Sequence, residues 1–332
     1  MNGTIRKVSV TGPIGKTVVC EYGVIENTDG KTGEKTEEKT AVIEIAKAAG
    51  LTLLSEEERN PLYTTTYGVG EVIKDAVRNG CRKFIVGIGG SATNDGGAGM
   101  LQALGFGLLK ENGEQIPIGA RGLEELAEIT DDNVIPELAE CKFKIACDVT
   151  NVLCGETGAS AVYGPQKGAD EEMTERLDRL LFSYASLVKK KIPKADSMYP
   201  GTGAAGGLGF AFLTFMDAQL ESGIQIVIKE TGLEQEIAKA DLVITGEGRM
   251  DGQTAMGKAP IGIAKIAKKY GKPVIAFAGA AARDAGACNE QGIDAFFPIL
   301  REAVSLEAAM KRENAEANME AAVEQAYRLW RL

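Results

Sequence analysis

Short apolar runs that end in glycine-rich clusters constrain this chain of 332 residues more than any other feature. The clearest case spans residues 84–100, where Phe84, Ile85 and Val86 are followed by glycines, small hydroxyl residues and one Asn-Asp pair. A short β-rich run before turn residues predicts a buried strand. The glycines let other groups approach the backbone closely. Two interpretations follow: a tight strand-to-helix turn capped by Asp95, or the wall of a small-molecule site.

The rest of the chain alternates between strand and helix patterns, which predicts an α/β fold with a parallel sheet. In such sheets ligands bind at the carboxyl ends of the strands. Residues 7–10 and 17–25 are expected to form a hairpin. Residues 27–40 contain no apolar side chain and are expected to form an exposed loop. Further strands are predicted at residues 41–45, 143–146, 241–244, 273–277 and 295–299, and helices at residues 169–191, 260–270 and 306–332.

Composition excludes several classes of function. The chain has no histidine, which rules out Ser-His-Asp and Cys-His hydrolases and His-ligated zinc. A formal net charge of -10 argues against nucleic acid or an anionic membrane as partner. The six cysteines form no C-x-x-C pair, and reduced thiols predict a cytoplasmic protein. No apolar stretch approaches the roughly 20 residues of a membrane span.

Three glycine motifs are imperfect matches to nucleotide-binding signatures. Residues 87–92 and 201–206 nearly fit a dinucleotide fingerprint, but the first lacks the acidic residue about 20 positions on and the second follows Pro200 instead of a strand. Residues 252–258 fit G-x-x-x-x-G-K, yet Ala259 stands where a P-loop has Ser or Thr. An NAD-dependent oxidoreductase and a P-loop enzyme are therefore minor alternatives.

Acids and amides follow three of the predicted strands. One acid after a strand is usually a helix cap, but three such places, with glycines and cations nearby, fit a magnesium-phosphate site better. Phosphoryl transfer to a hydroxyl needs positioning, metal and charge neutralisation more than a strong base, so it suits a chain without histidine. The candidates are Asn94, Asp95, Asp148, Asn151, Glu247 and Asp251, with the cations Lys167, Arg249 and Lys258.

Seven segments of the sequence resemble the bacterial glycerate kinase family. They are residues 10–15 (VTGPIG), 60–71 (NPLYTTTYGVGE), 87–105 (GIGGSATNDGGAGMLQALG), 146–151 (ACDVTN), 163–169 (YGPQKGA), 201–209 (GTGAAGGLG) and 241–258 (DLVITGEGRMDGQTAMGK). The resemblance spans essentially the whole chain. It implies a cytoplasmic transferase, a kinase that phosphorylates D-glycerate with ATP and Mg²⁺, with 2-phosphoglycerate favoured as the product.

The resemblance also implies two α/β domains, a flavodoxin-like parallel-sheet domain and a mixed α/β domain inserted into it. Members of the family begin with a strand-helix-strand unit. This sequence enters the family pattern after that unit. We therefore expect residues 1–235 to form the mixed domain with the glycine-rich loops, and residues 236–332 to form the remainder of the flavodoxin-like domain. A truncated chain could have lost activity.

Chemical type and position at strand ends indicate a role for each candidate residue. Asp148 would accept or orient the proton of the glycerate hydroxyl, and Asp95 with Asn94 would position glycerate or metal. Lys167 and Arg249 would neutralise phosphate or carboxylate charge, and Glu247 with Asp251 would hold magnesium. The remaining expected contacts with substrate or nucleotide are Gly89, Gly90, Ser91, Thr93, Asn151, Gly203, Gly206, Thr245, Gly246 and Lys258. The alternative from another class is an inactive protein that only binds glycerate or nucleotide.

Overall fold

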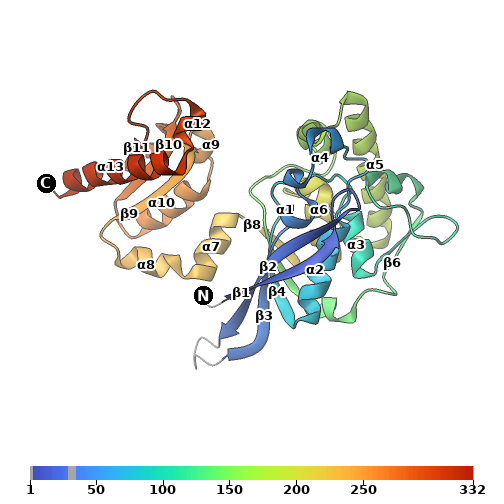
Figure 1. Ribbon diagram of the computed structural model, residues 1–332. Helices are drawn as coiled ribbons and strands as arrows, with labels where there is room; N and C mark the ends of the chain where they lie inside the picture. The colour runs from blue at the N-terminus through green and yellow to red at the C-terminus, as the bar shows by residue number, and fades with distance from the viewer. Residues whose placement is uncertain (1–2, 29–34, 332) are drawn as a thin grey trace. The chain divides into compact units, whose positions relative to one another are not determined.

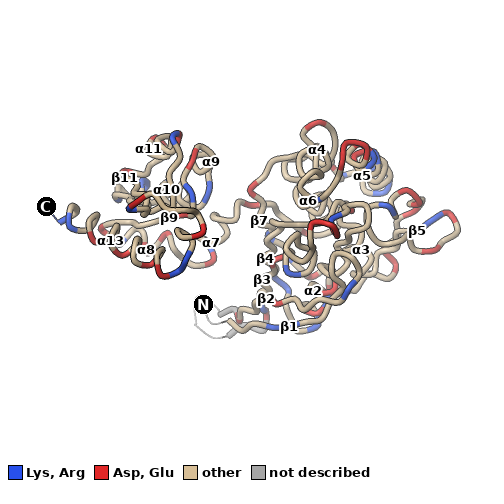
Figure 2. Tube along the Cα trace, turned by 45° about the horizontal axis from the view of Figure 1, so that its top comes forward, with Lys and Arg blue, Asp and Glu red and all other residues tan. Residues whose placement is uncertain are grey.

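The computed structural model describes residues 3–28 and 35–331 of the chain. It divides into two compact units, Met1–Ser222 (unit 1) and Gly223–Leu332 (unit 2). Each unit has its own sheet with helices packed on it (Figure 1), and acidic and basic residues are interspersed along both (Figure 2). The predicted α/β class, with one mixed and one parallel sheet, is confirmed. The predicted boundary after residue 235 falls within a helix of unit 2, and the domain assignment stays a prediction.

The main sheet of unit 1 has six strands in the order β1-β2-β3-β4-β7-β8. The first three strands pair antiparallel, as the predicted hairpin requires, and the last four pair in parallel. A separate antiparallel pair joins β5 and β6. The strands are β1 Gly3–Thr11, β2 Thr17–Thr28, β3 Lys35–Glu44, β4 Cys81–Gly87, β5 Gly107–Leu109, β6 Glu128–Thr130, β7 Lys142–Ala146 and β8 Ala218–Glu221.

The four parallel strands end in one row. Glu44, Gly87, Ala146 and Glu221 are paired across β3, β4, β7 and β8. The segments that follow β4 and β7 therefore leave the sheet side by side at its carboxyl edge, where α/β proteins bind ligands.

The helices of unit 1 bury one apolar side against this sheet. In α2 the buried residues Val69, Val72, Ile73 and Ala76 recur with helical spacing, which forms a stripe that packs into the core. Phe84 of β4 stacks on a phenylalanine of β7 with 4.6 Å between ring centres. The helices are α1 Ala46–Ala49, α2 Tyr67–Arg78, α3 Ala98–Leu104, α4 Ala159–Tyr163, α5 Glu171–Lys191 and α6 Ala204–Phe215, with 3-10 turns η1 Leu51–Leu53, η2 Glu56–Glu58, η3 Ala120–Glu125, η4 Pro136–Glu140 and η5 Pro165–Lys167.

The start of α6 is not regular helix. Ala205, Gly206 and Gly207 are consecutive left-handed residues. Ala205, at φ 53°, is the one non-glycine residue with positive φ in the part of the chain that the structure describes. Its methyl group is strained in this conformation, which costs an L-residue about 1–2 kcal/mol.

We therefore expect Ala205→Gly to leave the free energy of unfolding unchanged or raise it by up to about 1 kcal/mol, because relief of strain offsets the greater freedom of glycine in the unfolded chain. Urea denaturation measures this. The matched control is Ala185→Gly, in the regular helix α5, which should lose about 1 kcal/mol or more. Equal losses in the two variants would show that Ala205 is not strained.

Unit 2 has a three-stranded parallel sheet in the order β11-β10-β9. Alternate residues of β10 face opposite sides: Ala276 packs in the cluster that includes Ile261 of α10, and Phe277 packs with Ala326 of α13. The two helices thus cover opposite faces of the sheet. The elements are α7 Gly223–Thr231, α8 Leu233–Lys239, β9 Val243–Met250, α9 Gly252–Ala255, α10 Ala259–Lys269, β10 Val274–Ala281, α11 Ala287–Glu290, β11 Ala295–Pro298, α12 Leu306–Ala309 and α13 Arg312–Trp330.

Three sequence predictions about elements need correction. The segment after residue 244 is not a loop, because β9 stays paired with β10 as far as Met250. Its glycines let the two backbones lie close together, since a Cβ on Gly246 would overlap the carbonyl oxygen of Phe277. Lys35 to Thr40 belong to β3 and not to an exposed loop, while residues 29–34 lie outside the described residues. The predicted closing helix is two helices, α12 and α13.

Candidate active site

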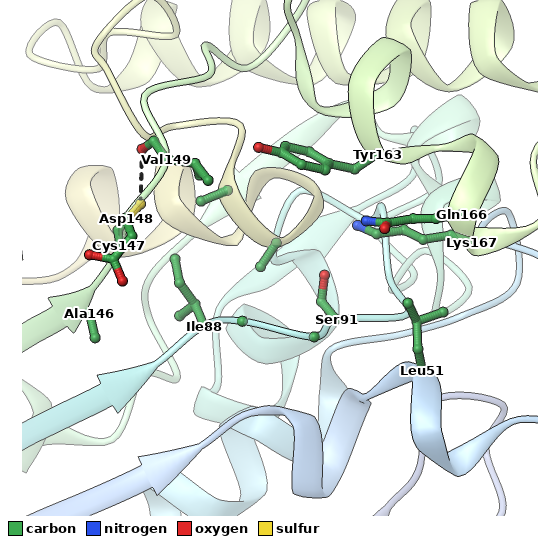
Figure 3. A pocket seen from close by; sticks show the side chains of 14 residues that line it. Leu51, Ile88, Ser91, Ala146, Cys147, Asp148, Val149, Tyr163, Gln166 and Lys167 are labelled. Carbon is green, nitrogen blue, oxygen red and sulfur yellow. Dashed lines mark hydrogen bonds between the residues drawn. The ribbon is translucent and has the colours of Figure 1, made fainter. Parts of the chain in front are cut away.

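A pocket of about 340 Å³ lies at the carboxyl edge of the unit 1 sheet. Figure 3 shows Asp148 at one end of it, Gln166 and Lys167 at the other, and Ser91 between them. The lining residues come from η1, from the segment after β4, from the end of β7 and the segment after it, from α4 and η5, and from the start of α6. They are Leu51, Ile88, Gly89, Gly90, Ser91, Ala146, Cys147, Asp148, Val149, Tyr163, Gln166, Lys167, Ala204 and Ala205.

The wall after β4 is fixed by main-chain hydrogen bonds to the turn beyond β3. Leu51 N donates to the carbonyl of Gly90 at 2.9 Å, and Ala92 N donates to the carbonyl of Ala49 at 2.8 Å. Gly90 has a φ of 69°, a conformation that glycine adopts without strain. These contacts present Ser91 in the pocket wall.

Asp95 lies beneath the pocket and does not line it. Its side chain is fully buried, and it accepts hydrogen bonds from Thr66 N at 2.8 Å, Gly97 N at 3.1 Å and Gly99 N at 3.3 Å. The Thr66 hydroxyl also donates to it. Burial raises the pKa of Asp95, and these hydrogen bonds oppose that shift. The carboxylate therefore ties the start of α2 to the start of α3.

Thr93 and Asn94 are also fully buried and outside the pocket lining. Asn94 Nδ2 donates to the Ser160 hydroxyl at 2.9 Å. Asn94 Oδ1 and Thr93 Oγ1 have no hydrogen-bond partner among the described residues. The sequence predicted both as direct binding residues, but their place in the structure is one layer below the pocket.

Lys167 connects this buried layer with the pocket. Its Nζ donates to the carbonyl of Thr93 at 2.7 Å, and the residue is only 2% exposed although it lines the pocket. Burial lowers the pKa of Lys167 to about 7, and the nearby charge of Asp95 opposes the shift. Burial thus favours the neutral amine of Lys167 over its ammonium form more than water does.

Asp148 stands on the other side of the pocket, just beyond β7. Its Oδ1 accepts a hydrogen bond from the Ser222 hydroxyl at 2.8 Å. Asn151 lies further along this loop and joins its two ends, because it donates to the Thr157 carbonyl at 2.9 Å and accepts from the Tyr163 hydroxyl at 2.6 Å. Asn151 therefore shapes the loop and is not among the residues that line the pocket.

Two predicted binding glycines have packing roles. A Cβ on Gly206 would overlap the carbonyl oxygen of Thr93, and one on Gly203 would overlap that of Val152. Both glycines hold α6 against the loops that build the pocket. Tyr163 and Gln166 also line the pocket and were not among the predicted site residues, although both stand in the YGPQKG cluster beside Lys167.

In unit 2 the predicted residues gather around the end of β9. Thr245, Gly246, Glu247 and Arg249 lie within the strand. Asp251 caps α9 through Thr254 N at 3.1 Å, and the Thr254 hydroxyl donates to the carboxylates of both Glu247 and Asp251. Lys258 Nζ lies 3.7 Å from Asp251. The hydrogen bonds from Thr254, and the charge of Lys258, lower the pKa of Asp251.

The family model of the Glycerate kinase family matches residues 1–331. The chain belongs to the glycerate kinase family. Glycerate kinase from Halalkalibacterium halodurans is 48% identical over 94% of this chain and 80% of its own length. Glycerate 2-kinase from Escherichia coli K12 is 47% identical over 93% of this chain and 78% of its own length.

A solved structure agrees with this assignment. A crystal structure of a protein from Salmonella typhimurium LT2 is 46% identical, with a TM-score of 0.82 over 98% of this chain and 82% of that chain. The predicted membership of the glycerate kinase family and the predicted kinase class are thus confirmed. Matches over most of the chain also argue against the inactive alternative.

A glycerate kinase of this family uses a nucleotide as phosphoryl donor, so the predicted class of cofactor is confirmed as well. Over residues 3–28 and 35–331 of this family member, we find no helix with the length and apolar character needed to cross a membrane.

Proposed function

We propose that this protein transfers the γ-phosphoryl group of ATP to a hydroxyl group of D-glycerate bound in the unit 1 pocket. The observation that carries the proposal is a small pocket, in a member of the glycerate kinase family, with an acid at one end and a buried lysine at the other. A three-carbon hydroxy acid offers the complementary groups, a carboxylate and hydroxyls. The name of the Escherichia coli relative favours the 2-hydroxyl group.

Asp148 accepts or orients the proton of the attacking hydroxyl, and the hydrogen bond from Ser222 holds its carboxylate in place. Ser91 and the backbone at Gly89 and Gly90 contact the substrate from the wall of the pocket. Lys167 supplies positive charge to the anionic substrate. Thr93, Asn94 and Asp95 act from the layer below as positioning residues, because they are buried and outside the lining.

Unit 2 offers residues suited to nucleotide phosphates. Lys258 and Arg249 are cations beside the end of β9, and Thr245 and Gly246 lie on the same strand. We assign these residues to the binding of the ATP phosphates, with charge neutralisation as their contribution to transfer.

Mg²⁺ would be held by Glu247 and Asp251. Among the described residues no three His, Cys, Asp or Glu side chains form a ready metal site. Mg²⁺ in kinases is usually bound by one or two carboxylates together with substrate phosphates, and these two acids both contact the Thr254 hydroxyl, so the pair fits such a partial site. When bound, the ion neutralises charge on the phosphate oxygens during transfer. A cytoplasmic location, where ATP is available, is part of the same proposal.

The direct test is ADP release in a coupled assay with ATP, Mg²⁺ and D-glycerate. We expect turnover with D-glycerate and none above background with glycerol, which lacks the carboxylate. Phosphorus NMR of the product then distinguishes 2-phosphoglycerate from 3-phosphoglycerate. Stabilisation of the protein by D-glycerate without ADP release would instead support the inactive binding protein.

A further inference from the structure

The pocket has opposite charges at its two ends. Among the described residues that line it, Asp148 is the only acid and Lys167 the only base. Figure 3 shows them on opposite sides, with Ser91 between. An anionic ligand is repelled at the Asp148 end and attracted at the Lys167 end, so a hydroxy acid has one favoured direction in the pocket.

The hydrogen bond of Lys167 within the protein does not neutralise the positive charge of its ammonium group. The acceptor of its hydrogen bond is the neutral carbonyl of Thr93. Asp95, the acid whose charge acts on Lys167, already accepts hydrogen bonds from donors at the starts of α2 and α3. An ammonium group has three donors, and a carboxylate in the pocket would satisfy donors that this carbonyl does not.

Three other titratable groups near the pocket keep their protons at neutral pH. Burial raises the pKa of Cys147 and of Tyr163 in the lining, and of Tyr184 on α5, so all three stay protonated. The charge of Asp95, below the pocket, raises the pKa of Lys167. Asp148 faces Lys167 from the opposite end of the pocket.

We propose that Lys167 recognises the carboxylate of the substrate and takes up a proton from solvent when the substrate binds. This inference rests on the proposed function and makes it specific: the pocket selects short hydroxy carboxylates over polyols, and places the hydroxyl that reacts toward Asp148. The proton forms the third N–H bond of the ammonium group, and the buffer acid supplies it. Lys167 is 2% exposed and its Nζ donates to a neutral carbonyl, so its surroundings disfavour the ammonium form and lower the pKa of Lys167 to about 7. Uptake therefore occurs above neutral pH.

The test is isothermal titration of the full chain with D-glycerate in two buffers of different ionisation enthalpy. We expect uptake close to one proton per glycerate at pH 8 and close to none at pH 6, where Lys167 already carries its proton. Lys167→Arg should bind glycerate without uptake, because guanidinium stays charged at both pH values. Lys167→Met should bind about tenfold more weakly or worse, also without uptake.

Lys189→Met is the matched control, since Lys189 donates to the Ala195 carbonyl outside this pocket and should leave binding and uptake unchanged. Glycerate binding and turnover with no buffer-dependent heat at pH 8, or unchanged affinity in Lys167→Met, would overturn the inference and leave the proposed function standing. Neither binding nor ADP release in the unaltered protein would overturn the proposed function itself.

Discussion

Replacement of Asp148 by Asn is expected to lower kcat with D-glycerate by roughly a thousandfold, within the range usual for loss of a general base. The amide cannot take the proton of the attacking hydroxyl, although it fills the same space. Because Asp148 is exposed at the mouth of the pocket and not in the core, the free energy of unfolding should change by less than about 0.5 kcal/mol. Initial rates of ADP release and urea denaturation of the same preparation measure the two effects.

Asp132→Asn makes the same chemical change at an exposed acid of unit 1 outside the pocket lining, and should leave kcat unaltered. A kcat of Asp148→Asn within threefold of the unaltered protein would remove Asp148 from the reaction. The substrate hydroxyl would then need another proton acceptor.

Replacement of Asp95 by Asn should act mainly on stability. The amide nitrogen that replaces one carboxylate oxygen cannot accept a hydrogen bond, so part of the set that Thr66, Gly97 and Gly99 now donate is lost. Buried donors would be left without partners, so we expect the free energy of unfolding to fall by at least about 3 kcal/mol. Urea denaturation of unit 1, followed by a signal from its sheet, measures the loss.

Asp170→Asn is the comparison for this variant, because Asp170 is an exposed N-cap of α5 whose carboxylate accepts from Met173 N. Asparagine also caps helices well, and we expect a loss below about 1 kcal/mol. If Asp95→Asn kept the stability of the unaltered protein but lost turnover, Asp95 would act on the substrate and not through the loop that it supports.

The spacing of apolar residues in the sequence predicted helices with one buried apolar face and strands made of one short apolar run. The strand at Phe84 and the long helix that Asp170 caps are both present, because apolar spacing and a capping residue are local signals. The extent of β9 was missed, since glycines normally indicate a turn, and here they allow close contact with β10. That contact is made by residues about 30 positions away, which a local pattern does not reveal.

For the pocket of unit 1, position after a strand predicted two of the segments that line it, but not the direction of each side chain. Ser91 and Lys167 reach the pocket, whereas Asp95 on the same loop as Ser91 turns into the core. Where the main chain bends at glycines, neighbouring side chains can point into the pocket or into the core. No sequence pattern indicated that Ser222 would donate a hydrogen bond to Asp148, because this contact depends on β8 ending beside β7.

The crystal structure of this chain with D-glycerate tests the central claim most directly. The account predicts one ordered glycerate molecule in the unit 1 pocket, with its carboxylate within hydrogen-bonding distance of Lys167 Nζ and a hydroxyl group directed to Asp148. Ordered glycerate bound elsewhere on the chain, with this pocket filled only by solvent, would contradict it.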